Sequence, residues 1–158
     1  MKFPHLIILE TDGWIARLLR ELAGESRWLL REPKSSDTAL SLTRESRPGV
    51  VVVQFEPSDE KPAPFALIAD VHRLCPDVPV IAVSNAKLSD ADKAAWTATL
   101  MDLGARCVLF PPLSRPVLED VASGLMAASV RRMIGSEPVE APAKSDDVID
   151  LADEENAE

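Results

Sequence analysis

Apolar positions follow two alternating spacings along most of the chain. Short continuous runs of Val, Ile and Leu are typical of strands buried on both faces, and each is followed by apolar positions three or four residues apart, which predict a helix. This alternation, with short connections, predicts a parallel sheet with helices on both faces. The predicted strands are His5–Glu10, Arg27–Leu30, Val50–Gln54, Val78–Asn85 and Arg106–Phe110.

Capping residues and helix stops give the predicted helix limits. Asp12 is expected to cap the first helix and Gly24 to end it. Ser35 or Ser36 is expected to begin the second helix, and the third helix follows the proline-rich loop Pro57–Pro64. Ser89 or Asp90 is expected to begin the fourth helix and Gly104 to end it, and the fifth helix is expected to run from Ser114 to about Ile134. Five strand–helix units of this size predict an α/β fold, a flavodoxin-like doubly wound sheet of five parallel strands.

Charge divides the chain into two parts. The net charge is −9, but residues 135–158 contain nine acids and one lysine, so the first 134 residues are nearly neutral. We expect one folded domain over residues 1–134 and an acidic disordered tail over residues 135–158, which cannot bury enough apolar surface to fold. Acidic residues repel phosphate backbones and no basic stripe offsets them, so we expect no nucleic-acid binding.

One segment of the tail stands apart in its composition. In Asp146–Glu155, the apolar residues Val148, Ile149 and Leu151 lie among acids. Two interpretations stay open: a solubilising segment, or a short motif that becomes ordered on a partner, for example by adding a strand to a sheet edge.

Hydropathy and metal-ligand spacing exclude several protein classes. The mean hydropathy is +0.01, and no apolar run approaches the ~20 residues of a membrane span. The run Leu6–Leu9 is too short for the core of a signal peptide, so we expect a cytoplasmic protein without membrane contact. Cys75 and Cys107, like the isolated histidines, lack the spacing of metal ligands, and we expect no metal and no cofactor.

The ends of the predicted strands are where an open α/β sheet binds its ligands. The strand in "RPGVVVVQFEP" ends at Gln54, whose amide is neither a nucleophile nor a base. The residues at the other strand ends are Glu10, Thr11 and Asp12, then Ser84, and finally Pro111.

The chain from about His5 to Leu125 resembles the receiver domain of bacterial response regulators, the phosphorelay proteins of two-component signal transduction. The similar stretches are "ILETDGWIARLL", "RPGVVVVQ", "VPVIAVSN", "GARCVLFPPLS" and the helix after Ser114. The resemblance implies a pocket in which an aspartate accepts a phosphoryl group and holds Mg²⁺ together with two further acids. A lysine and a hydroxyl would contact the phosphoryl oxygens, and an aromatic residue on the fifth strand would respond to them.

At the matching positions this chain keeps little of that chemistry. Glu10 and Ser84 are compatible with it, whereas Thr11 replaces an acid next to Asp12. Gln54 replaces the phosphoacceptor, Pro111 replaces the lysine and Val108 replaces the aromatic residue. An amide forms no acyl phosphate, and the lost charges weaken a Mg²⁺ site. The resemblance therefore implies a degenerate pseudo-receiver without catalytic residues.

Two other residues, Glu56 and Lys87, are candidates to replace the lost acceptor and the lost positive charge. Glu56 is expected to point over the pocket and Lys87 to be a solvated loop lysine, so neither is expected to restore the activity.

We expect a non-catalytic signalling module that acts through protein partners, independently of phosphorylation. The face expected to bind them, or to form a homodimer, consists of the fourth helix, the fifth strand and the last helix. The apolar stripe of the last helix is either core cover or an oligomer seam. The candidate contact residues are Trp96, Met126, Val130, Met133 and Ile134, with Val148, Ile149 and Leu151 in the tail.

Two other functions remain as alternatives. The first is a residual phosphoacceptor or Mg²⁺-dependent phosphoryl-transfer protein that uses Glu10, Asp12, Glu56 and Ser84. The second is a flavodoxin-like domain that binds a small ligand at the strand ends, although no Gly-rich phosphate loop follows any strand.

Overall fold

A five-stranded parallel sheet forms the centre of the protein. The computed structural model describes residues 3–58 and 62–136. The strands are β1 (His5–Leu9), β2 (Leu29–Arg31), β3 (Gly49–Gln54), β4 (Val80–Val83) and β5 (Cys107–Leu109). Their order in the sheet is β2-β1-β3-β4-β5, with every neighbouring pair parallel. This is the flavodoxin-like doubly wound α/β fold predicted from the sequence.

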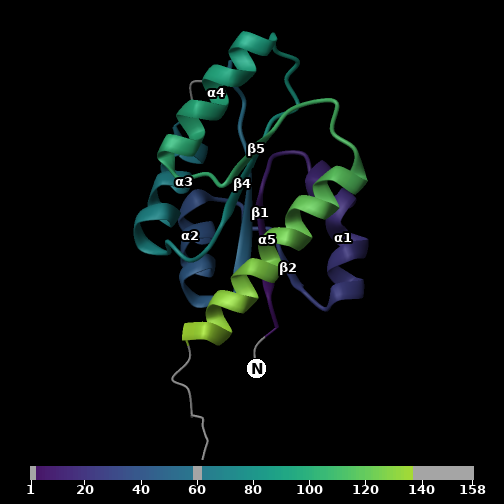
Figure 1. Ribbon diagram of the computed structural model, residues 1–158, viewed down its shortest axis with the longest axis vertical. Helices are drawn as coiled ribbons and strands as arrows, with labels where there is room; N and C mark the ends of the chain where they lie inside the picture. The colour runs from purple at the N-terminus through teal and green to yellow at the C-terminus, as the bar shows by residue number, and fades with distance from the viewer. Residues whose placement is uncertain (1–2, 59–61, 137–158) are drawn as a thin grey trace, which may run out of the picture.

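Helices cover both faces of the sheet. They are α1 (Trp14–Ser26), α2 (Ser36–Glu45), α3 (Ala63–Leu74), α4 (Asp90–Leu103) and α5 (Arg115–Ser136). Helices α1 and α5 lie on one face, and α2, α3 and α4 lie on the other (Figure 1). Among the residues that the structure describes, no helix has both the length and the apolar character required to span a membrane.

The run of four valines is explained by the position of β3 at the centre of the sheet. All six residues of β3 are buried. Because side chains alternate along a strand, Val50 and Val52 pack into the core under α1 and α5, while Val51 and Val53 pack into the core under α2, α3 and α4. A strand buried on both faces needs apolar residues at every position until Gln54.

Several predicted element limits were wrong. Four strands are shorter than predicted, with β2 at Leu29–Arg31, whereas β3 begins one residue earlier than predicted, at Gly49. Gly24 lies within α1, which ends where Arg27 adopts a left-handed backbone with φ 61°. Glycine permits such a turn without requiring it, and nothing crowds the position of a Cβ on Gly24, so the helix continues through it.

The start of α3 and the end of α5 also differ from the prediction. Helix α3 begins at Ala63, so Pro64 lies in its first turn instead of in the preceding loop. Proline is tolerated there because the first-turn N–H groups have no partner within the helix. Helix α5 continues to Ser136, so Gly135 and Ser136 belong to the helix and not to the tail.

Candidate functional site

The polar residues singled out at the strand ends gather at one edge of the sheet. Because all strands are parallel, the ends of β1, β3, β4 and β5 lie together at the carboxyl edge. The structure places Glu10, Thr11, Gln54, Ser84 and Pro111 there. Gln54 is 7% exposed and Ser84 is fully buried.

The side-chain amide of Gln54 is hydrogen-bonded at both of its ends. Its Oε1 accepts from the backbone N–H of Thr11 at 3.0 Å and from the Thr11 hydroxyl at 3.2 Å. Its Nε2 donates to Glu56 Oε2 at 3.2 Å. Gln54 therefore connects the loop after β1 to the loop after β3. A polar group this deeply buried needs such partners.

Glu10 uses its carboxylate to cap α1. Its Oε1 accepts from the N–H of Ile15 at 2.8 Å and its Oε2 accepts from the N–H of Ala16 at 2.9 Å. The residue at the N-cap, Gly13, has no side chain to do so. A carboxylate here satisfies two free N–H groups and complements the positive end of the helix dipole.

The prediction that Asp12 caps α1 was wrong. Asp12 is exposed, and its carboxylate has no hydrogen bond to the described residues. Only its backbone carbonyl is engaged, accepting from Arg17 Nη1 at 3.5 Å. Helix α1 begins one residue too late for the Asp12 side chain to reach its N–H groups, because Gly13 separates them with a left-handed φ of 77°.

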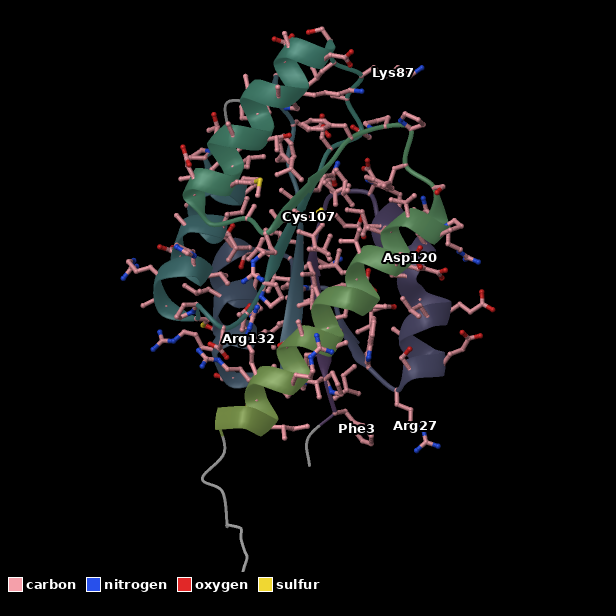
Figure 2. The ribbon with its side chains drawn as sticks, in the orientation of Figure 1. Phe3, Arg27, Lys87, Cys107, Asp120 and Arg132 are labelled. Carbon is pink, nitrogen blue, oxygen red and sulfur yellow. The ribbon has the colours of Figure 1, made fainter. Side chains whose placement is uncertain are left out.

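Ser84 and Pro111 complete the edge. The Ser84 hydroxyl accepts a hydrogen bond from the N–H of Ala86 at 3.0 Å, within its own loop. The Pro111–Pro112 peptide bond is cis. Lys87 is exposed, and Figure 2 shows its side chain extending away from the end of the molecule. Glu56 is held by Gln54.

Four aromatic rings form a cluster beside this edge that the sequence did not reveal. Phe55 packs against Phe65, Trp96 and Phe110, with ring centroids 6.3, 5.8 and 5.9 Å apart. Phe65 stacks on Trp96 at 5.8 Å with an interplanar angle of 20°. We call Phe55, Phe65, Trp96 and Phe110 the aromatic cluster. It joins the end of β3, the start of α3, α4 and the end of β5.

The sequence signal for the aromatic cluster was adjacency to the site. Phe55 directly follows Gln54, and Phe110 directly precedes Pro111. Trp96, a candidate contact residue, is half-buried against the core. Val108, at the position of the expected aromatic residue, packs against that same core.

The candidate contact residues of α5 divide between core and surface. Met126 is 1% exposed, so the prediction that it contacts a partner was wrong: it fills the core beneath α5. Val130 packs against that core, Met133 is half-buried, and Ile134 is 54% exposed. The tail candidates Val148, Ile149 and Leu151 lie outside the described residues.

A hollow of about 530 Å³ opens beside Gln54. It lies between the ends of β1 and β3 and the starts of α2 and α3, where the direction of strand addition reverses and doubly wound folds bind ligands. Thr11, Lys34, Asp37 and Phe65 are part of its lining.

Titratable groups near the edge are dispersed. Within the described ranges, no three His, Cys, Asp or Glu residues group closely enough to hold a metal ion. Burial raises the pKa of the Cys107 thiol above its ordinary value, and a backbone hydrogen bond from Val108 opposes this in part. The thiol therefore remains protonated at neutral pH.

No family model and no curated protein matches the sequence. The structure, however, is similar to solved receiver domains. The signal receiver domain of a Luxo repressor protein from Vibrio parahaemolyticus has a TM-score of 0.65 at 15% identity, over 85% of this chain and 99% of that one. A response regulator from Chloroflexus aurantiacus has a TM-score of 0.61 at 18% identity, over 80% of this chain and 99% of that one.

The chain has the fold of a receiver domain. The receiver domain of the Francisella response regulator 1452 agrees, with a TM-score of 0.60 at 18% identity, over 78% of this chain and 97% of that one. At the carboxyl edge, Gln54 contacts Thr11, and both line the hollow together with Glu10. At such identities the similarity carries the fold alone.

Proposed function

We propose that this protein is a receiver-like signalling module that works without phosphorylation and without catalysis, by binding other proteins. The observation that carries the proposal is the Gln54 amide, which occupies the end of β3 and is satisfied by Thr11 and Glu56. A neutral, hydrogen-bonded amide supplies neither a nucleophile nor a negative metal ligand at the position where a receiver needs both.

The state of Glu10 supports the same proposal. Both of its carboxylate oxygens accept hydrogen bonds from α1, so binding a cation would compete with the cap. Pro111 offers no positive charge for a phosphoryl group, and Lys87 points outward. At this edge, Pro111 therefore provides no positive charge, the Glu10 carboxylate is already hydrogen-bonded, and the Lys87 side chain points away from the site.

We infer that partner proteins bind the face formed by α4, β5 and α5. Most of α4 is exposed: Ala91, Ala94, Ala95 and Ala98 lie at the surface, and Met101 is 50% exposed. On α5, Val117 is 47% exposed. Small exposed side chains allow another chain to approach closely, and the neighbouring apolar residues give it surface to bury. A second copy of this chain is one partner of this kind.

The phosphorylation part is tested by incubating the full chain with a small phosphodonor and Mg²⁺ and measuring its intact mass. We expect no added phosphoryl group under conditions that modify a receiver domain with its aspartate. A stable addition would overturn the proposal and favour a residual phosphoacceptor.

The interface part is tested by sedimentation equilibrium. Ala98→Arg, on the exposed face of α4, is expected to weaken self-association, whereas Ala66→Arg on the exposed surface of α3 serves as the matched control. Equal effects of the two variants would move the interface elsewhere, and a monomer at every concentration would contradict the homodimer.

The hollow beside Gln54 favours one second candidate function, binding of a small ligand. Its volume lies within the range of about 300–1,000 Å³ typical of ligand pockets. A thermal-shift screen with nucleotides and flavins tests it. Stabilisation that disappears when Ala63→Trp fills the hollow would support this function over protein binding alone.

A further inference from the structure

Arginines collect at the amino edge of the sheet, opposite the candidate site. Because the strands are parallel, every helix C-terminus and every strand start lies there. Figure 2 shows Arg27, Arg132 and Phe3 at this end of the molecule and Lys87 at the other. We call the following residues the arginine edge: Arg44 in α2, Arg47 before β3, Arg73 in α3, and Arg131 and Arg132 in α5.

Side-chain contacts hold this edge together in three dimensions. Arg47 Nη1 pairs with Asp77 Oδ1 at 3.2 Å, and Arg132 Nη1 donates to the carbonyl oxygen of Asp77 at 3.2 Å. One loop, between α3 and β4, is therefore bound from both the α2 side and the α5 side. The buried Ser129 hydroxyl fixes α5 further, since it donates to the carbonyl of Gly49 at 3.1 Å and accepts from its N–H at 3.3 Å.

Within the described ranges, carboxylates pair with two of the five arginines of the arginine edge. Asp77 pairs with Arg47, and Asp70 pairs with Arg73 at 3.2 Å. Arg44 and Arg131 are exposed, and neither has an ion pair or side-chain hydrogen bond to a residue in the described ranges. Arg44 and Arg73 lie in the last turns of α2 and α3, where a positive charge complements the helix dipole. The last turn of α5 contains no basic residue, so the helix dipole does not explain the positions of Arg131 and Arg132.

The sequence that follows α5 has the opposite charge. Residues 137–158 contain nine acids and one lysine, and they begin five residues after Arg132. We propose that the acidic segment Asp146–Glu155 binds the arginine edge of its own chain. Guanidinium groups suit carboxylates because they can form two parallel charge-assisted hydrogen bonds, which an ammonium cannot.

The tether makes this contact effective even if it is weak. Ten extended residues from 137 to 146 reach up to ~33 Å, enough to return along the amino edge. A short link of this kind gives an effective concentration on the order of millimolar. Ile134 follows Arg132 by two residues in α5 and is 54% exposed, so it gives Val148, Ile149 and Leu151 an apolar side chain to pack against.

Paramagnetic relaxation in the full chain tests the contact. A nitroxide is attached at Ala152→Cys in a Cys107→Ser background, with the buried Cys75 left in place. At low salt it should broaden the backbone amide signals of Arg47, Asp77 and Arg132 but not that of Lys87. At ~1 M salt, where the screening length falls to ~3 Å, the broadening should disappear.

Matched charge reversals make the test specific. Arg131→Glu with Arg132→Glu should abolish the broadening, whereas Lys87→Glu with Lys93→Glu, the same change of charge at the carboxyl edge, should leave it intact. Neutralising the tail instead, with Asp146→Asn, Asp147→Asn and Asp150→Asn, leaves the folded domain unaltered and should weaken the broadening several-fold.

Three results would overturn the proposal. These are absence of broadening at low salt, equal effects of the two charge reversals, and broadening of an unlabelled chain mixed with a labelled one. The last would show that the tail binds a second copy and not its own domain.

Discussion

At the scale of single residues, two side chains at the carboxyl edge form hydrogen bonds with other residues of the same chain. Glu10 caps α1, and Gln54 joins Thr11 to Glu56. Both residues would be free to serve a ligand if those bonds were absent. The contribution of these hydrogen bonds can therefore be measured as a change in the free energy of unfolding.

Glu10→Ala should destabilise the protein by about 1–2 kcal/mol, the usual cost of losing an N-terminal helix cap. The neighbouring Asp12→Ala is the matched control and should change the free energy of unfolding by less than about 0.5 kcal/mol, since its exposed carboxylate has no described partner. Urea denaturation of both variants measures this. Equal losses would restore Asp12 as the cap.

Gln54→Glu should destabilise the protein at neutral pH by about 1–3 kcal/mol, because a carboxylate would replace the amide that donates to Glu56 at 3.2 Å. Two carboxylates at this separation repel each other unless they share a proton. The loss should therefore shrink as the pH falls below about 5. Denaturation curves at both pH values check the trend, and a loss independent of pH would point to packing instead.

The Cys107 thiol should alkylate slowly at neutral pH and faster as the pH rises, because its raised pKa keeps the reactive thiolate scarce. The same shift favours the folded state below the unfolded pKa, and this contribution is lost as the pH rises through the higher folded pKa. Mass spectrometry with iodoacetamide measures the rate, with Cys107→Ser as control. A rate equal to that of a free cysteine would contradict the shift.

At the scale of elements, the end of α4 depends on a glycine. Gly104 has a φ of 128°, and a Cβ there would overlap the Cβ and Cγ of His72 on α3. Gly104→Ala should therefore cost about 2 kcal/mol or more, whereas Gly124→Ala, in open space within α5, should stabilise by about 0.5–1 kcal/mol. Thermal unfolding of the pair decides; matching signs would contradict the geometry.

Element types could be predicted from the sequence because strand and helix periodicities are local. The four valines of β3 predict a central strand without reference to any other segment. The cap on α1 was mispredicted, because Glu10 reaches it only through the left-handed turn at Gly13. The aromatic cluster was missed, since Phe55 and Trp96 meet through packing of segments far apart in the chain. Residues at strand ends were found, but their hydrogen bonds were not.

At the scale of the whole molecule, one sheet supports both cores. Alternate valines of β3 belong to opposite cores, so neither core can be lost while β3 stays folded. We expect one cooperative unfolding transition. Trp96 packs against the core under α2, α3 and α4, whereas Trp14 and Trp28 pack against the core under α1 and α5, so tryptophan fluorescence can report on each core.

Two variants separate these reports. A chain with Trp14→Phe and Trp28→Phe, compared with a chain carrying Trp96→Phe, allows each core to be followed by fluorescence in urea. After correction for the stability of each variant by circular dichroism, fluorescence and circular dichroism should give the same midpoint within each. Separate midpoints would show that the two cores unfold independently.

The hydrogen bonds of Glu10 and Gln54 also limit which substitutions this edge of the sheet tolerates. Aspartate at position 54 would be too short to keep the bridge to Thr11 and would bring a second negative charge towards Glu56. Releasing Glu10 for a cation would leave the N–H groups of Ile15 and Ala16 without their partner. Each of these single changes thus lowers folding stability before it adds any chemistry. A phosphorylatable aspartate at this edge would therefore require several substitutions together, each offsetting the folding stability that another one costs.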